Sequence, residues 1–215
     1  MSLYPSEEII PVKKVVLATR NVGKIEEFDR MLRNAQLDIQ VLGLRDFPYM
    51  PEVDETGSTF EENALLKARE ISSFTHLPSL ADDSGLCVDA LNGAPGIFSA
   101  RWAGTHGDDK ANLEKVLREL SELDNPSMGA QFQCAVALVF PHTHANAGLE
   151  VVHQREIVGE IVVVPRGTNG FGYDPIFQPH GYSETTAELA AEHKDQISHR
   201  GKALQAMLPD LRRLL

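Results

Sequence analysis

The sequence predicts an α/β or α+β protein built around a mixed β-sheet. Strand and helix patterns alternate in the first half of the chain, and two strand patterns in the second half, residues 132–140 and 157–163, are placed to pair antiparallel. The 215 residues are 42% hydrophobic and 24% charged, which suits one large domain or two closely packed lobes with an ample core.

The first strand is the apolar run from Val15 to Ala18, and a turn follows at residues 21–24. A helix comes next, because apolar residues recur at helical spacing: Ile25, Phe28, Met31, Leu32 and Ala35. The order of these segments makes a β-loop-α unit.

A second helix is expected to begin near Ser58 or Thr59, since each is followed three residues later by Glu, as in a capping box. One face of this helix is apolar and is expected to be buried: Phe60, Ala64, Ala68 and Ile71. The other face carries Asn63, Lys67 and Glu70 at one-turn spacings.

Residues 80–88 have the composition of a strand that is interrupted by Asp82-Asp83-Ser84-Gly85. A polar insertion where a buried strand would carry apolar residues often marks a functional site. A loop rich in Gly and Pro follows at residues 92–96. The next helix has one apolar stripe: Leu113, Val116, Leu117, Leu120 and Leu123.

The second half begins with a half-buried strand, in which apolar residues alternate at period two: Phe132, Cys134, Val136, Leu138 and Phe140. It is expected to pair with residues 157–163 through a connection at 142–148. Residues 166–174 contain three glycines and two aromatics, which is typical of a functional or tightly folded loop before the apolar pair 176–177. Ser198 caps a last helix with an inward apolar face: Ala203, Leu204, Met207, Leu208 and Leu211.

The net charge of −11 argues against a nucleic-acid-binding protein, because the field of the whole molecule repels polyanions and no basic patch offsets it. A few fixed cations with a divalent metal can still hold a triphosphate. No run approaches the roughly 18 apolar residues that span a bilayer, and no signal peptide is indicated. We therefore expect a cytoplasmic protein with no nucleic-acid or membrane partner. Cys87 and Cys134 are expected to be buried thiols.

The turn from Thr19 to Lys24 favours an anion such as phosphate, because backbone N–H groups, the Asn21 side chain and a lysine meet at a helix N-terminus. It is not a Walker A loop, since the first glycine is absent and Ile25 stands where Ser or Thr would bind magnesium. An ordinary capped strand-to-helix turn explains the same residues equally well.

Three carboxylates, Glu55, Asp82 and Asp83, lie in or beside turns that contain glycine. Mg²⁺ prefers such oxygens, and it takes one or two carboxylates while keeping waters and substrate phosphates. Solvated turns are the common alternative for an isolated Asp-Asp pair. The position of Asp82 and Asp83 inside an apolar strand favours a functional role.

Three cationic residues, Lys194, His199 and Arg200, cluster around the start of the last helix, where the helix dipole disfavours positive charge. Either Asp195 or Glu192 neutralises them at the surface, or they bind a ligand rich in hydrogen-bond acceptors.

Two aromatic residues, Phe171 and Tyr173, lie among glycines and could stack a base or fill the core. Three histidines, His142, His144 and His153, lack a further ligand at zinc spacing and are not expected to bind metal.

Together, six segments of the chain resemble the inosine triphosphate pyrophosphatase family. They are Thr19 to Lys24, Glu55 to Ala64, Ala81 to Leu86, Gly93 to Arg101, Gly170 to Pro175 and Ser198 to Gly201. The resemblance runs from about Val15 to Leu208. Trp102 departs from the tyrosine that is frequent in the family, and residues 141–150 match none of its motifs.

The resemblance implies a single catalytic domain at residues 12–215, with two α/β lobes around a long mixed sheet and an active-site cleft between them. Residues 1–11 lie outside it, as an N-terminal extension that is frayed or left from cloning. It also implies a homodimer. The family splits nucleoside triphosphates such as ITP, dITP and XTP between the α and β phosphates with Mg²⁺, and releases pyrophosphate.

The resemblance implies a role for each matching residue. Thr19, Asn21 and Lys24 would hold the triphosphate. Glu55 and Asp83 would bind the metal, Asp83 would also be the proton acceptor, and Ser84 would contact the substrate. The nucleobase pocket would consist of the following residues: Phe171, Gly172, Tyr173, Asp174, Lys194, His199 and Arg200. Lys194 and Arg200 only donate hydrogen bonds, so they suit the 6-keto oxygen of hypoxanthine and xanthine better than the 6-amino group of adenine.

Other hypotheses are weaker. A nucleotide-sensing module would keep the phosphate turn and base pocket but would have no need of Asp83 beside Glu55. Among enzymes, the alternative is a related pyrophosphatase that acts on modified pyrimidines or other aberrant nucleotides.

Overall fold

The computed structural model describes residues 13–215, so the predicted extension at residues 1–11 lies outside the described residues. Six strands form one sheet in the order β2-β1-β3-β4-β5-β6. The strands are β1 Lys13–Leu17, β2 Ile39–Gly43, β3 Ser79–Val88, β4 Gly129–Val139, β5 Glu150–Ile161 and β6 Phe177–Pro179. The α-helices are α1 Val22–Asn34, α2 Phe60–Thr75, α3 Asp109–Ser121, α4 Ala191–Ile197 and α5 His199–Leu214. Short 3-10 helices lie at Leu44–Asp46, Asp89–Leu91, Gly96–Arg101 and Asp174–Ile176.

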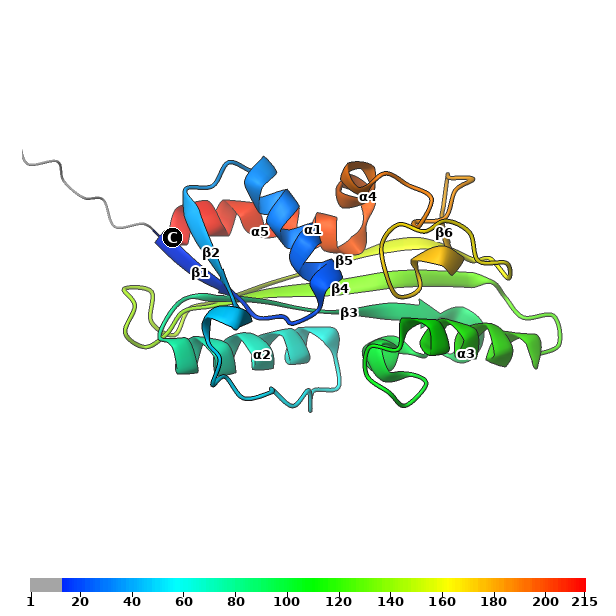
Figure 1. The fold of residues 1–215 in the computed structure, drawn as a ribbon, viewed down its shortest axis with the longest axis horizontal. Helices are drawn as coiled ribbons and strands as arrows, with labels where there is room; N and C mark the ends of the chain where they lie inside the picture. The colour runs from blue at the N-terminus through cyan, green and yellow to red at the C-terminus, as the bar shows by residue number, and fades with distance from the viewer. Residues whose placement is uncertain (1–12) are drawn as a thin grey trace, which may run out of the picture.

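The mixed sheet predicted from the sequence is confirmed. β1 runs parallel to β2 and β3, whereas β3, β4, β5 and β6 pair antiparallel in that order. The long strands β3, β4 and β5 extend along the molecule in Figure 1, with α1 and α5 on the opposite side from α2, and with α3 toward the far end of the strands. No helix among residues 13–215 is long and apolar enough to cross a membrane.

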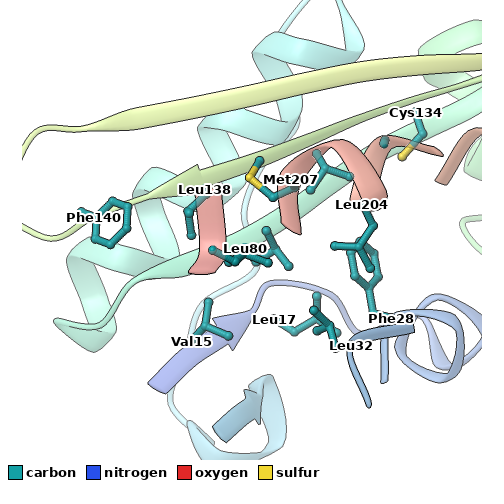
Figure 2. Close-up of a cluster of buried hydrophobic side chains, with 13 residues drawn as sticks. Val15, Leu17, Phe28, Leu32, Leu80, Cys134, Leu138, Phe140, Leu204 and Met207 are labelled. Carbon is teal, nitrogen blue, oxygen red and sulfur yellow. The ribbon is translucent and has the colours of Figure 1, made fainter. Parts of the chain in front are cut away.

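The core has separate clusters along these shared strands. In one, shown in Figure 2, Phe28 from α1 and Leu204 and Met207 from α5 lie against Leu80 and Leu138 of the sheet. A second cluster buries α2 against the sheet through the residues predicted for it: Phe60, Ala64, Ala68 and Ile71. A third lies at the other end and joins α3 to the sheet: Leu86, Val88, Leu113, Val116, Leu120, Phe132 and Ile157.

The predicted helix starts are confirmed in three places. Asn21 caps α1 by accepting from the Lys24 N–H, Thr59 rather than Ser58 caps α2, and Ser198 caps α5. In each cap a side-chain oxygen satisfies an N–H group that has no partner inside the helix.

Two strand predictions were wrong in detail. β3 is not interrupted at residues 82–85, because every residue of Ser79–Val88 pairs in register with β4, and backbone pairing does not depend on whether the side chain is polar. β5 begins at Glu150 and ends at Ile161 instead of spanning 157–163, since β4 provides partners for its polar first half as well. The predicted connection at 142–148 lies between the two strands.

Candidate active site

The candidate site lies where β1 ends beside β3. β1 pairs with β3 only at Val16–Ser79 and Leu17–Leu80, whereas β3 continues to Val88 along β4. The turn at residues 19–21 and the start of α1 directly follow β1. The part of β3 that follows Leu80 therefore runs beside the N-terminus of α1, outside the β1 ladder.

Side-chain alternation along β3 sends the adjacent aspartates in opposite directions. The Asp82 carboxylate faces α1 and accepts an ion pair from Lys24 Nζ at 2.9 Å. The Asp83 carboxylate faces α2, where Asn63 Nδ2 donates at 3.2 Å and Lys67 Nζ at 3.0 Å. Asp82 thus pairs with cations on one face of the sheet, and Asp83 pairs with Lys67 on the other face.

A cleft of about 610 Å³ joins the cations of the two faces. It is lined by every site residue predicted above: Thr19, Asn21, Lys24, Glu55, Asp83, Ser84, Phe171, Gly172, Tyr173, Asp174, Lys194, His199 and Arg200. Residues as far apart in the sequence as Thr19 and Arg200 are therefore brought together, while the role of each stays a prediction.

The turn before α1 is both a capped strand-to-helix turn and a part of the cleft that could bind an anion. Asn21 Oδ1 accepts from the Lys24 N–H at 3.0 Å, and Thr19 Oγ1 accepts from the Asn21 N–H at 3.2 Å, as in an ordinary capped turn. The same turn lines the cleft and carries the Lys24 ammonium at a helix N-terminus. This is a favourable place for an anion.

Glu55 and Asp83 converge on a single positive charge. Lys67 Nζ lies 2.8 Å from Glu55 Oε1 and 3.0 Å from Asp83 Oδ1, and Arg101 Nη1 lies 3.0 Å from Glu55 Oε2. Two carboxylates that meet at one cation fit the oxygen donor set that Mg²⁺ takes from proteins. These residues are therefore suited to hold the metal predicted for them.

The two carboxylates differ in proton affinity. Burial raises the pKa of Asp83 above its ordinary value, and the nearby Lys67 and Lys24 offset this only in part. Burial acts on Glu55 in the same direction, but Lys67 and Arg101 outweigh it and lower the pKa of Glu55. Asp83 is therefore the better proton acceptor of the pair.

Arg200 is the centre of a buried charge network and is only 2% exposed. Its Nη1 donates to Glu27 Oε2, its Nε and Nη2 donate to Asp82 Oδ2 at 3.2 Å, and its Nη2 also donates to Ser84 Oγ at 2.7 Å. Although burial would lower the pKa of Arg200, Glu27 and Asp82 raise it. Arg200 therefore stays charged inside the protein.

Lys194 pairs with carboxylates far away in the sequence. Its Nζ donates to Glu27 Oε1 at 2.8 Å and to Asp174 Oδ2 at 2.5 Å. The alternative in which Asp195 neutralises these cations is wrong, because Asp195 instead accepts two hydrogen bonds from Arg30, at 2.5 and 2.8 Å. The packing of α1 beside α4 and α5 explains the change of partners, since it brings Glu27 to the cations.

The two loop aromatics have different positions. The Tyr173 side chain is buried in the third cluster and its hydroxyl donates to Ser99 O at 2.8 Å. The Phe171 ring lies within 5.1 Å of Lys194 Nζ, and the Gly172 N–H donates to Asp109 Oδ2 at 2.9 Å, which holds the loop to α3. Tyr173 thus fills the core, and Phe171, which lines the cleft, is the aromatic better placed to contact a base.

His199 is stacked on Phe132, with ring centroids 4.7 Å apart and an interplanar angle of 8°. Burial and the neighbouring Arg200 lower the pKa of His199 well below its ordinary value, so the ring is neutral. Its Nδ1 is buried without a hydrogen-bond partner among the described residues. A polar atom of this kind beside a cleft is suited to meet a ligand.

Sequence reasoning missed two residues of the network and one ion pair. Glu27 lies one turn after Lys24 in α1, between the apolar residues Ile25 and Phe28. An acid among the apolar residues of this helix is the signal that could have indicated a buried charge. Helical spacing predicts Lys67 on the polar face of α2 but gives it no role. Arg101 lies in a motif that was recognised, but its contact with Glu55 depends on the tertiary fold.

The chain's sequence matches the profile of the Ham1 family over residues 15–210. The chain belongs to the Ham1 family. It is 52% identical to a protein named dITP/XTP pyrophosphatase from Streptomyces coelicolor, over 94% of this chain and 98% of that protein. It is 49% identical to a protein of the same name from Mycobacteroides abscessus, over 94% of this chain and 96% of that one.

Solved Ham1 structures agree with this membership. A HAM1 protein from Coxiella burnetii superposes with a TM-score of 0.83 at 42% identity, and the match covers 94% of this chain and 99% of that one. The α/β architecture predicted from the sequence is therefore confirmed for this chain. The family resemblance drawn from the six motifs is confirmed as well.

Proposed function

We propose that this Ham1 protein hydrolyses non-canonical purine nucleoside triphosphates, such as ITP, dITP and XTP, to the monophosphate and pyrophosphate. The observation that carries the proposal is one cleft in which Lys24 at a helix N-terminus, the converging pair Glu55 and Asp83, and the buried donors Lys194 and Arg200 all meet. Relatives that are about half identical over nearly their whole length carry the name dITP/XTP pyrophosphatase.

We assign each end of the cleft a part in the reaction. Lys24 stabilises negative charge on the triphosphate, and Asp83 accepts the proton of the attacking water. Mg²⁺ held by Glu55 and Asp83 would neutralise phosphoryl oxygens when bound. A sensing module would need the phosphate and base contacts but not a proton acceptor of raised pKa beside a second carboxylate, which favours turnover.

The proposed preference for 6-keto purines rests on hydrogen-bond direction. The described contacts account for two of the three Lys194 N–H groups and four of the five Arg200 N–H groups. Each side chain therefore keeps one donor. A donor meets the C6 oxygen of hypoxanthine or xanthine favourably but opposes the amino group of adenine.

A direct test is the identity of the products. Purified protein incubated with ITP and Mg²⁺ should give inosine monophosphate and pyrophosphate in equal amounts. Formation of inosine diphosphate and orthophosphate would place the cleavage at the wrong bond and reject the proposal.

We also propose that the protein is a homodimer and that it acts on the nucleotide pool in the cytoplasm. Sedimentation of the purified protein at the mass of one chain would contradict the dimer.

Glu55→Gln should weaken the apparent affinity for Mg²⁺ at least about tenfold, because even residues that only support metal ligands cost about 10–100-fold when changed. Activity should recover in part at high metal. Magnesium titrations of ITP hydrolysis measure this effect, with Glu61→Gln, an exposed residue in the first turn of α2, as the control. Coincident titrations for Glu55→Gln and the parent would mean that Glu55 is not a ligand.

Lys24→Ala should lower kcat/KM for every triphosphate tested by roughly 10–150-fold, since a hydrogen bond to a charged group contributes about 1.5–3 kcal/mol. A lysine on phosphate carries no information about the base. Steady-state rates with ITP, XTP and GTP check this, beside Lys110→Ala on the surface of α3 as the control. A loss confined to one nucleobase would be inconsistent with a phosphate contact.

A further inference from the structure

Lys67 occupies the place where the two proposed metal ligands converge. Its Nζ lies between Glu55 Oε1 at 2.8 Å and Asp83 Oδ1 at 3.0 Å, and its side chain is 13% exposed. The other oxygens are also engaged, Glu55 Oε2 by Arg101 at 3.0 Å and Asp83 Oδ2 by Asn63 at 3.2 Å. All four carboxylate oxygens thus accept a hydrogen bond from a neighbouring side chain.

This arrangement conflicts with simple addition of a divalent ion. Mg²⁺ needs carboxylate oxygens at about 2.0–2.1 Å in a nearly octahedral shell. An ammonium that remained on the same two oxygens would face a double positive charge at very short range, in a poorly hydrated place where charges interact strongly. A metal bound at Glu55 Oε1 and Asp83 Oδ1 therefore competes with the two Lys67 ion pairs.

We propose that Lys67 is a built-in counter-cation of the metal site, which holds Glu55 and Asp83 together before the metal arrives and is displaced from them when it binds. The inference rests on the proposed function, since it takes Glu55 and Asp83 as the metal ligands. Lys67 is in this sense a positioning residue. It prevents the repulsion of two adjacent buried carboxylates and keeps them aimed at one point.

The displacement also explains why metal and nucleotide would bind best together. The released ammonium needs new acceptors, because a buried cation without a partner is costly. The phosphate oxygens of a triphosphate in the same cleft provide them. Metal alone must break two ion pairs without this replacement, so its affinity for the nucleotide-free protein is kept low.

The test is calorimetric titration of Mn²⁺, as a probe for the divalent site, into the metal-free parent and its variants. Lys67→Met should bind Mn²⁺ roughly tenfold or more tightly than the parent, because the competing charge is gone. Lys67→Arg should keep the weak affinity of the parent, since it keeps the charge. Lys115→Met removes another half-buried, ion-paired lysine away from the site and should change nothing. Equal affinities for Lys67→Met and the parent would overturn the proposal.

A second measurement needs no variant. Acetylation of lysines, read by mass spectrometry, should leave Lys67 protected in the metal-free parent and modify it when Mn²⁺ is saturating. Lys194 is the matched control, because its side chain is also largely inaccessible and paired with two carboxylates, Glu27 and Asp174, and it should stay protected in both states. Unchanged protection of Lys67 at saturating Mn²⁺ would show that the metal does not displace it.

The variants distinguish an error in the metal site from an error in the role of Lys67. If Glu55→Gln binds Mn²⁺ as the parent does, the assignment of the metal site is wrong, and the proposed role of Lys67 is rejected as well. If Glu55→Gln loses affinity while Lys67→Met does not gain it, the metal site stands and only the role of Lys67 is rejected.

Discussion

Asp83→Asn should reduce kcat/KM for ITP by roughly 10²–10⁴-fold, the range that a proton acceptor contributes, and should leave the fold intact. The change removes a metal oxygen charge and the acceptor together while it preserves the shape of the side chain. The backbone of residue 83 remains paired with Ala135 of β4, so the strand does not depend on the carboxylate. Rates are measured by pyrophosphate release, and circular dichroism verifies the fold.

A matched control separates catalysis from a general loss of negative charge. Asp89 is an exposed aspartate directly after the same strand, and Asp89→Asn should keep the parent rate. Parent-like rates in folded Asp83→Asn would remove Asp83 from the reaction.

Arg200→Ala should destabilise the protein by up to about 3–5 kcal/mol, because Glu27 and Asp82 stay buried and lose the cation they share, so that each keeps only one partner, Lys194 or Lys24. The loss is measured by urea unfolding at neutral pH. Arg33→Ala is the control, since that side chain is 77% exposed in its pair with Asp29 and such surface pairs contribute about 0.2–1 kcal/mol. Equal unfolding midpoints for the two variants would contradict a structural role for Arg200.

The same loss should depend on pH in a defined direction. Burial alone would raise the pKa values of Asp82 and Glu27, but their cations lower both below the ordinary values of 3.8 and 4.5. A lowered folded-state pKa gives stability that is present above the ordinary value and is lost as the pH falls through the folded one. The difference between parent and Arg200→Ala should therefore be largest near neutral pH and should narrow in acid.

Arg200→Ala also tests base recognition in the molecules that remain folded. The ITP-over-ATP preference should shrink, mainly because ITP hydrolysis slows, whereas the ITP-over-GTP ratio should change less, because guanine also has a 6-keto oxygen. An unchanged ratio of ITP to ATP would leave Arg200 with a structural role alone.

Local features of the fold were predictable from the sequence because their causes are local. Asn21, Thr59 and Ser198 cap helices through their own side chains, and the apolar faces of α2 and α5 follow helical spacing. All the predicted site residues line one cleft for a different reason: their motifs resembled a known family, and no local rule brings Lys24 near Arg200.

Features set by tertiary contacts were missed. The continuity of β3 through Asp82 and Asp83 follows from pairing with β4, and cations from α1, α2 and α5 neutralise the two buried carboxylates. The partners of Lys194 could not be found by looking for nearby acids, because Glu27 lies 167 residues away along the chain. Short-range charge rules offer only Asp195 or Glu192 as neutralising acids, and Asp195 pairs with Arg30 instead.

The central claim is that this cleft selects and cleaves 6-keto purine triphosphates with the help of a divalent metal. The measurement that tests it most directly is kcat/KM for ITP, XTP, GTP and ATP, by pyrophosphate release, with Mg²⁺ and with the metal chelated. The account predicts efficient cleavage of ITP and XTP, a loss that can reach roughly 10⁴-fold for ATP, and no turnover without metal. Pyrophosphate release from ATP as efficient as from ITP, or undiminished activity in chelator, would contradict it.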